Sequence, residues 1–152
     1  MTAYPLTLLK SYSSLKTVIH EIDKLIYETA ISPYPLGYEQ STFSHVETIT
    51  KYVQKRDNLE ILKRAIAKVL NGIDHDTRVL LYLRFIKRAK ISRIADFLGC
   101  SLRTVYRKSQ RALITFSKAL TRSGYNETWF LENYSKIRWL SALYKRIQSC
   151  SK

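Results

Sequence analysis

Residues 91–113, ISRIADFLGCSLRTVYRKSQRAL, predict two short helices joined by a tight turn, the second of which is strongly basic. Ala95 and Gly99 lie four residues apart, as expected where a small residue lets a partner helix cross and a glycine takes a left-handed backbone in the turn. Ser101 follows the turn and is expected to cap the second helix. The segment is therefore typical of a helix-turn-helix.

Four apolar residues are expected to fill the space between these two helices: Ile94, Leu98, Leu102 and Val105. Six side chains are expected to point outward from the second helix: Arg103, Tyr106, Arg107, Ser109, Gln110 and Arg111. Side chains of these types reach base edges and phosphates when a helix lies in the major groove of DNA. The capped start of the helix also offers free N–H groups and a positive dipole end to a phosphate.

The first half of the chain is also predicted to be helical, because apolar residues recur at three- and four-residue steps. One helix is expected over about residues 14–30, and the prolines and glycine of residues 31–39 then break it. A second helix is expected to start at a capping box made by Ser44 and Glu47 and to end at Gly72 with a left-handed cap. These two helices are expected to form either an antiparallel hairpin or a coiled-coil dimer.

In the second half, Asp74 or Asp76 is expected to cap a third helix that runs to Ile86 and carries three basic residues outward: Arg84, Lys87 and Arg88. The basic helix is expected to continue to about residue 120, followed by a turn at residues 122–125. Asn126 is expected to cap a last helix to about Ile147, whose aromatic residues either pack on their own domain or form a docking surface for a partner protein.

The expected fold class is all-α, because the chain has only four Gly and three Pro, which disfavours sandwiches and barrels. Three segments are predicted: an N-terminal helical hairpin over 1–72, a helix-turn-helix domain over 73–122 and a C-terminal amphipathic helix over 123–152. The hairpin is interpreted as a dimerisation or polymerase-contact element.

The net charge of +14 indicates a polyanionic partner, either nucleic acid or an acidic membrane surface. Residues 84–122 carry eleven Lys and Arg with Asp96 as the only acidic residue, whereas residues 1–60 carry six basic and seven acidic residues. Because the excess coincides with the helix-turn-helix, double-stranded DNA is the expected partner. No stretch approaches the roughly 18 apolar residues of a membrane span, and no secretory segment is visible, so a cytoplasmic protein that does not enter membranes is expected.

No pattern of catalytic residues is found, and the chain is predicted not to be an enzyme. His20, His45 and His75 lie apart, and there is no Gly-rich phosphate loop. The two cysteines, Cys100 and Cys150, match no metal or redox spacing and are expected to be reduced thiols. No cofactor and no metal are therefore expected. A recombinase fragment is disfavoured, because Tyr106 lies within the basic helix rather than in a nucleophile setting.

The expected DNA contacts fall into two kinds. Arg103 and Arg107 are four residues apart on one helix face, and either is suited to a bidentate contact with guanine, while Tyr106 is suited to a thymine methyl group or a sugar. Contacts with phosphates, which set affinity and register, are expected from Arg88, Lys90, Arg93, Lys108 and Arg111.

Residues 74–113 resemble region 4 of the bacterial sigma-70 family, through LLYLRFI, ISRIADFLGCS and RTVYRKSQRAL. The resemblance implies that the motif binds a promoter −35 element in the major groove and that neighbouring apolar residues clasp the flap-tip helix of the RNA polymerase β subunit. Matching positions imply DNA contacts by Ser101, Arg103, Thr104, Tyr106, Arg107 and Arg111. The same matching implies a core of Ile94, Ala95, Leu98, Val105, Ala112 and Leu113.

Residues 1–70 lack the clustered aromatic residues of sigma region 2, and the whole arrangement is similar to small phage-encoded regulators of low-GC Gram-positive bacteria, including ArpU-like late transcriptional regulators. That resemblance implies a transcription regulator, associated with the nucleoid of a bacterial or phage-infected cell, that contacts DNA and RNA polymerase through its β flap or sigma. Three arrangements stay open: a stand-alone activator, dimeric through the hairpin; a divergent sigma factor; and a polymerase-binding protein with little DNA specificity.

Overall fold

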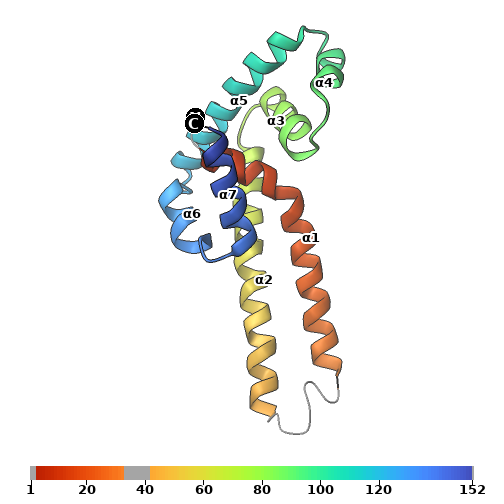
Figure 1. The fold of residues 1–152 in the computed structure, drawn as a ribbon, viewed down its shortest axis with the longest axis vertical. Helices are drawn as coiled ribbons and strands as arrows, with labels where there is room; N and C mark the ends of the chain where they lie inside the picture. The colour runs from red at the N-terminus through yellow and green to blue at the C-terminus, as the bar shows by residue number, and fades with distance from the viewer. Residues whose placement is uncertain (1–2, 33–41, 152) are drawn as a thin grey trace. The chain divides into compact units, whose positions relative to one another are not determined.

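The computed structural model describes residues 3–32 and 42–151, and within these residues it contains helices and no strand. The all-α fold class is confirmed. Most of the segment 31–39, where a break is predicted, lies outside the described residues. The elements, shown in Figure 1, are α1 Ala3–Ile31, α2 Thr42–Asn71, α3 His75–Leu81, η1 Tyr82–Ile86, α4 Ile91–Leu98, α5 Leu102–Arg122, α6 Glu127–Tyr134 and α7 Arg138–Cys150.

The chain divides into two compact units. Unit 1 consists of residues 1–13 and 65–152, and unit 2 consists of residues 14–64. This division cuts across the three predicted segments 1–72, 73–122 and 123–152. It places the first turns of α1, the last turns of α2 and both C-terminal helices in one unit with α4 and α5.

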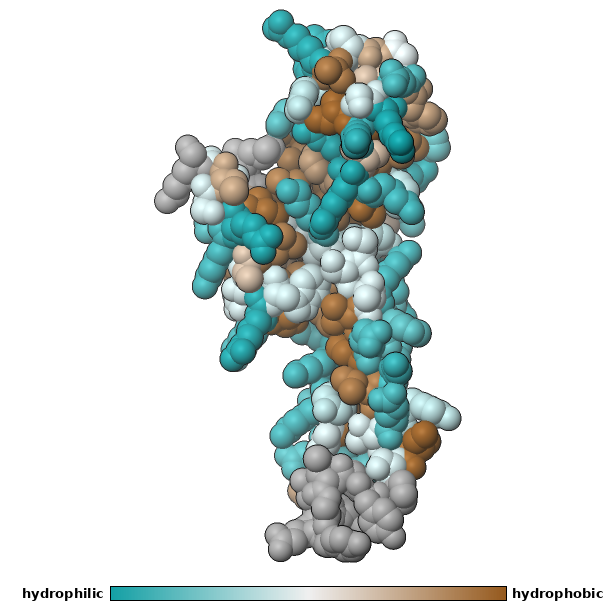
Figure 2. Space-filling model, turned by 45° about the vertical axis from the view of Figure 1, so that its right-hand side comes forward, coloured by the Kyte–Doolittle hydropathy of each residue, from teal (hydrophilic) through white to brown (hydrophobic). Residues whose placement is uncertain are grey.

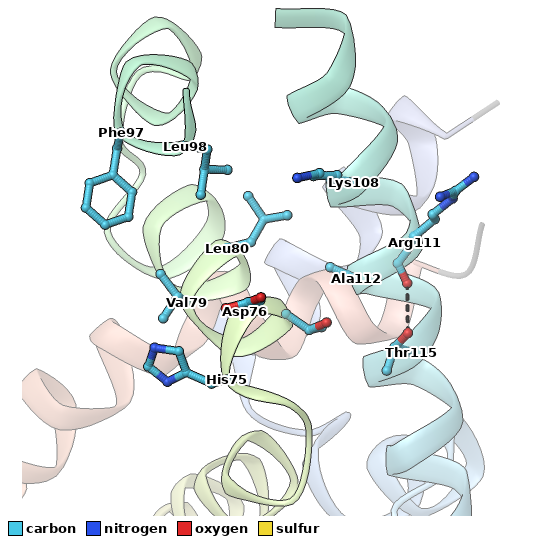
Figure 3. Close-up of a pocket in the computed structure, with 11 residues that line it drawn as sticks. His75, Asp76, Val79, Leu80, Phe97, Leu98, Lys108, Arg111, Ala112 and Thr115 are labelled. Carbon is cyan, nitrogen blue, oxygen red and sulfur yellow. Dashed lines mark hydrogen bonds between the residues drawn. The ribbon is translucent and has the colours of Figure 1, made fainter. Parts of the chain in front are cut away.

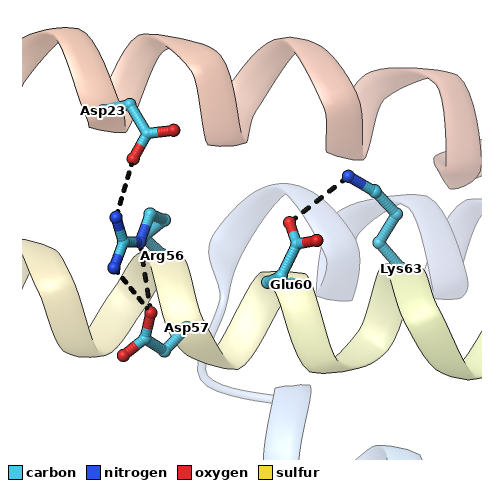
Figure 4. Close-up of polar contacts among 5 residues, drawn as sticks. All are labelled: Asp23, Arg56, Asp57, Glu60 and Lys63. Carbon is cyan, nitrogen blue, oxygen red and sulfur yellow. Dashed lines mark hydrogen bonds and ion pairs between the residues drawn. The ribbon is translucent and has the colours of Figure 1, made fainter.

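Unit 2 is built from the later part of α1 and the earlier part of α2, which lie side by side. Arg56 on α2 donates from Nη1 to Asp23 on α1 at 3.2 Å and from Nη2 to Asp57 at 2.9 Å, as Figure 4 shows. The buried apolar side chains of unit 2 are Leu15, Ile19, Leu59 and Leu62. Leu25 on α1 is 44% exposed, so the apolar face of α1 is only partly covered in unit 2.

The predicted capping box and glycine cap of α2 are both wrong. The helix begins at Thr42, so Ser44 already lies inside it and its carbonyl accepts a hydrogen bond from Thr48 Oγ1. Glu47 lies 3.6 Å from Lys51, one turn further along the helix, rather than reaching back to Ser44. The helix ends at Asn71 as expected, but Gly72 does not take a positive φ; its N–H donates to the carbonyls of residues 68 and 69.

The helix α1 begins eleven residues before its predicted start at about residue 14. Polar residues interrupt the apolar pattern there, but Thr7 and Ser11 are buried and donate their hydroxyls to carbonyls of the same helix, at 2.8 and 2.9 Å. A hydroxyl satisfied in this way can be buried at little cost. Pro5 is tolerated because it lies in the first turn, where an N–H has no helical partner.

Of the two predicted caps of the third helix, Asp74 and Asp76, the structure shows Asp74, whose carboxylate accepts the N–H of Thr77 at 2.9 Å. This hydrogen bond lowers the pKa of Asp74 below its usual value. The α-helix then widens into a π-helical stretch over Tyr82–Ile86, closed by the N–H of Lys87 donating to the carbonyl of Tyr82. The sequence predicts an ordinary α-helix there, and the π-helical stretch changes the direction in which residues 82–86 point.

The single last helix predicted from Asn126 to Ile147 is wrong: α6 ends at Tyr134 and α7 starts at Arg138. Asn126 does cap α6, accepting the N–H of Trp129 at 2.8 Å. The break lets α7 fold back along α6, so that the Tyr144 hydroxyl donates to Glu127 at 2.5 Å. In one straight helix these two residues would be about 25 Å apart.

An aromatic cluster fills the space between α6, α7 and the start of α1, all in unit 1. The Phe130 ring centroid lies 5.6 Å from that of Tyr4 and 5.9 Å from that of Tyr144. Tyr4 also donates its hydroxyl to the carbonyl of Tyr125. Burial raises the pKa of Tyr134 to about 12, and the hydrogen bond to Glu127 raises that of Tyr144 to about 12. These aromatic side chains therefore pack within their own unit.

None of the helices in the described part of the chain combines the length and apolar character needed to cross a membrane.

Candidate nucleic-acid interface

The turn between α4 and α5 has the geometry expected from its sequence. Gly99 takes a left-handed backbone with φ 62° and ψ 38°, and the N–H of Cys100 donates to the carbonyl of Ala95 at 3.1 Å. Ser101 then caps α5, because its Oγ accepts the N–H of Thr104 at 3.2 Å. The Thr104 hydroxyl is also hydrogen bonded to Ser101 Oγ, so both residues hold the start of α5 in place.

Packing of α4 against α5 follows the prediction except at its edge. Ile94, Ala95 and Val105 are buried, and Leu98 is half-buried. Leu102 is 51% exposed, which contradicts the expectation that it fills the space between the helices. It is the first residue of α5 and precedes the first buried position of the helix by three residues, so it lies at an uncovered helix end.

Ser109 does not point outward as predicted; it is 1% exposed and donates its hydroxyl to the carbonyl of Val105 at 2.7 Å. The burial of Ser109 is explained by Arg84 on η1, whose Nη1 donates to Ser109 Oγ at 3.3 Å. The prediction that Arg84 points outward is also wrong. Its guanidinium is half-buried, its carbon lies 4.8 Å from the ring centroid of Tyr106, and desolvation lowers its pKa. Arg84 thus makes a cation–π contact with the half-exposed ring of Tyr106.

A row of exposed arginines runs along α5, formed by Arg103, Arg107 and Arg111 at four-residue steps. Residues at this spacing lie on one face of a helix. The buried face of α5 is made by Val105, Ser109, Ala112, Leu113, Phe116 and Leu120. The arginine row therefore points away from the core, and polar side chains project around α4 and the start of α5 (Figure 2).

The other predicted phosphate contacts lie off this row. Lys90 precedes α4 as its N-cap residue and Arg93 lies in its first turn, both exposed. Lys108 is exposed but belongs to the flank of α5 that faces α3 and α4. Arg88 is exposed with a positive φ of 53°, and its Nη2 lies 3.5 Å from the carbonyl oxygen of Lys10. The structure thus groups Arg103, Arg107 and Arg111 and leaves Arg88 apart from them.

None of the cations of this interface forms an ion pair within the described residues. All the ion pairs that the described residues form lie in unit 2, and across α4 and α5 the only acidic side chain is Asp96. Unpaired cations on one exposed helix face produce a positive potential that attracts phosphates.

A pocket of about 580 Å³ lies beside the arginine row, between α3, α4 and α5. Figure 3 shows Val79, Leu80 and Leu98 inside it, with Phe97 at its edge and Lys108 reaching toward it from α5. The guanidinium of Arg111 points away from the pocket, although its carbonyl accepts the Thr115 hydroxyl at 3.1 Å. The pocket is mainly apolar, which suits contact with protein rather than with phosphates.

Three residues of this surface are absent from the predicted site. Phe97 is 70% exposed, although an aromatic residue on a short amphipathic helix normally faces the core. Ile114 is half-exposed and Lys118 exposed, both on the outward face of α5. Lys118 lies on the same helix face as Arg107 and Arg111, so the helical period of the sequence predicts its position. The contact of Arg84 with Ser109 cannot be predicted from neighbouring residues, because 25 residues separate the two.

Comparisons with known proteins add no relative: no family model, no curated protein and no solved structure matches the chain. Within the described ranges, no group of three or more His, Cys, Asp or Glu side chains is placed to hold a metal ion.

Proposed function

We propose that the chain is a sequence-specific DNA-binding transcription regulator that reads double-stranded DNA with α5 in the manner of a sigma region 4-like helix-turn-helix. The observation that carries the proposal is the row of Arg103, Arg107 and Arg111, exposed along one helix face without any ion pair. The tight turn at Gly99 and the cap at Ser101 fix the direction in which α5 starts.

The proposed docking places the outward face of α5 in the major groove. Arg103 and Arg107 reach base edges, and Arg111 and Lys118 reach phosphates further along the helix. Tyr106 lies at the edge of this face, where the stacked guanidinium of Arg84 limits its freedom. Lys90 and Arg93 at the start of α4 contact the phosphates of the flanking backbone.

RNA polymerase is the proposed second partner, bound through the pocket between α3, α4 and α5. The supporting observation is that Phe97 is 70% exposed beside an apolar pocket of about 580 Å³. An exposed aromatic residue beside an apolar pocket is typical of a protein interface. Arg111 borders both the pocket and the arginine row, but its guanidinium points away from the pocket, which is compatible with binding DNA and polymerase at the same time.

DNA reading is tested by selecting duplexes from a random pool with the full chain and then measuring affinities of variants for the selected site. The substitution Arg107→Ala is expected to weaken binding to the selected DNA site by about 1–3 kcal/mol and to relax the base preference at one base pair. The matched control is Arg64→Ala, an exposed arginine of unit 2, which is expected to leave binding unchanged. Equal affinity for selected and random duplexes would contradict sequence-specific reading.

Polymerase contact is tested by a pull-down with purified bacterial core RNA polymerase, followed by promoter-directed transcription with and without the housekeeping sigma factor. Phe97→Ser is expected to reduce the pull-down while leaving DNA affinity unchanged. The matched control is Phe43→Ser, because Phe43 is 77% exposed but lies in unit 2. Initiation without the housekeeping sigma factor would assign the chain as a sigma factor instead of a regulator.

The selected site also distinguishes the proposed arrangements. A dimer predicts two half-sites about one helical turn apart, whereas a sigma-like protein predicts one asymmetric site. Strong polymerase binding together with no preferred DNA site would favour the third arrangement, a polymerase-binding protein with little DNA specificity.

A further inference from the structure

A second cavity of unit 1, of about 620 Å³, lies between the start of α1, the segment from η1 to α4, and α7. We call it the α7 groove. Its apolar lining includes Leu6, Phe85, Leu143 and Ile147, of which Ile147 is buried and the others are half-buried. Neither the proposed DNA contacts of α5 nor the pocket beside Phe97 accounts for this apolar surface.

Four basic residues surround the apolar lining of the α7 groove: Lys10, Arg84, Arg88 and Arg146. None of the residues that line it is acidic, and no ion pair of the described chain involves any of these four cations. Arg84 is half-buried there; its guanidinium donates to Ser109 Oγ and lies over the Tyr106 ring, and its charge has no carboxylate partner. A cation removed from water in this way is stabilised when an anion from outside occupies the groove.

The backbone of Arg88 supports the same interpretation. Arg88 is the only residue other than glycine with a positive φ in the described chain. Such a conformation is unfavourable for a residue with a Cβ and is often found at functional sites. The Arg88 guanidinium donates to the backbone carbonyl of Lys10 at 3.5 Å, which joins the segment between η1 and α4 to α1 at the groove.

We propose that the α7 groove docks an acidic amphipathic helix of a partner protein, with apolar side chains on the groove floor and carboxylates facing the four cations. Helix-in-groove recognition uses this combination of apolar anchors and flanking charges. A DNA backbone brings phosphates but no side chains to fill the apolar floor, and a second copy of this chain brings a further net charge of +14. The proposal does not depend on DNA reading by α5.

The first test measures binding of a labelled synthetic helix, with leucines on one face and glutamates on its flanks, to the full chain by fluorescence anisotropy. Arg146→Glu is expected to weaken binding about tenfold, because it reverses a charge at the groove. Lys145→Glu makes the same change of charge at the neighbouring exposed position of α7, outside the groove lining, and is expected to change binding by less than about twofold. Equal losses would show non-specific attraction and overturn the proposal.

The second test needs no substitution, because Cys150 lines the groove and Cys100 lies in the turn before α5. The synthetic helix is expected to slow alkylation of Cys150 and to leave that of Cys100 unchanged. No protection of Cys150, or no binding of the synthetic helix, overturns the proposal. Protection of Cys150 by duplex DNA in place of the helix would assign the groove to nucleic acid and overturns it as well.

Discussion

Unit 1 and unit 2 differ in the balance of their basic and acidic residues and in the ion pairs that these form. Unit 2 has seven Lys and Arg and seven Asp and Glu, whereas unit 1 has nineteen and five. Unit 2 uses its charges internally: Arg56 joins α1 to α2 through Asp23, and further pairs run along α2. The cations of unit 1 form no ion pair among the described residues, and the whole net charge of the chain is carried by the unit that contains α4 and α5.

The same contrast holds for apolar side chains. Unit 1 has a fully buried core in which Phe116, Leu120, Phe130 and Leu140 are at most 1% exposed. A core of this kind offsets the repulsion between unpaired cations on the surface. In unit 2 the buried apolar side chains among the described residues are limited to Leu15, Ile19, Leu59 and Leu62, while Leu25 and Ile61 are exposed. We therefore expect unit 1, with its many unpaired cations, to depend more strongly on its core than the neutral unit 2 does.

Truncating one large side chain in each unit tests this difference in packing, and we expect it to give the largest change. Phe116→Ala is expected to lower the free energy of unfolding by about 3–5 kcal/mol, because a fully buried ring is lost and a cavity remains. Leu25→Ala is expected to lower it by less than about 1 kcal/mol, because Leu25 is largely solvated. Urea unfolding followed by circular dichroism measures both. Similar losses at the two positions would contradict the comparison.

The difference in charge is tested by the salt dependence of DNA binding. With about six to eight phosphates engaged, affinity is expected to fall roughly 10³-fold between about 50 and 200 mM salt. Lys118→Ala in unit 1 is expected to reduce the slope of log affinity against log salt by about one, whereas Lys55→Ala in unit 2 leaves it unchanged. Titrations of a labelled duplex measure the slopes. An equal reduction by both variants would mean that unit 2 also binds the backbone.

Several features of unit 1 that depend on local hydrogen bonds are predicted correctly, although the glycine cap at Gly72 and the helix type over Tyr82–Ile86 are not. The left-handed turn at Gly99 and the caps at Asp74, Ser101 and Asn126 each involve residues within three or four positions of one another. The exposed row on α5 is likewise predictable, because it follows from the helical period of the basic residues alone.

Features that depend on distant contacts are missed. The break after Tyr134 contains no Gly or Pro, and it forms because Tyr144 and Phe130 gain contacts across the fold-back. The burial of Ser109 depends on Arg84, a residue of another helix. At the start of α1, polar residues hide the apolar pattern, although their hydroxyls are satisfied within the helix. For the break after Tyr134 and for Ser109, a tertiary contact decides a feature that neighbouring residues leave open.

Two substitutions at Ser101 separate the stability of α5 from its binding. Ser101→Ala is expected to lower the free energy of unfolding by about 1 kcal/mol, because the N–H of Thr104 loses its acceptor. Ser101→Asp retains the cap and most of the stability, but is expected to weaken DNA binding because its charge repels a phosphate at the helix start. Asn126→Ala removes the cap of α6 and serves as control, with a similar loss of stability and no effect on DNA affinity. If Ser101→Asp binds DNA as tightly as the unmodified chain, no phosphate lies at the start of α5.

The smallest effect is expected where unit 2 already balances its charges. Arg56→Gln removes the hydrogen bonds to Asp23 and Asp57, yet these groups are accessible to water, which replaces most of the lost interactions. The thermal unfolding midpoint is therefore expected to fall only slightly at low salt. The difference from the unmodified chain should vanish at about 1 M salt, where the screening length is about 3 Å. A large fall that persists at high salt would show that Arg56 holds α1 against α2 by packing of its side chain rather than by its charge, and unit 2 would then share the dependence on packing that distinguishes unit 1.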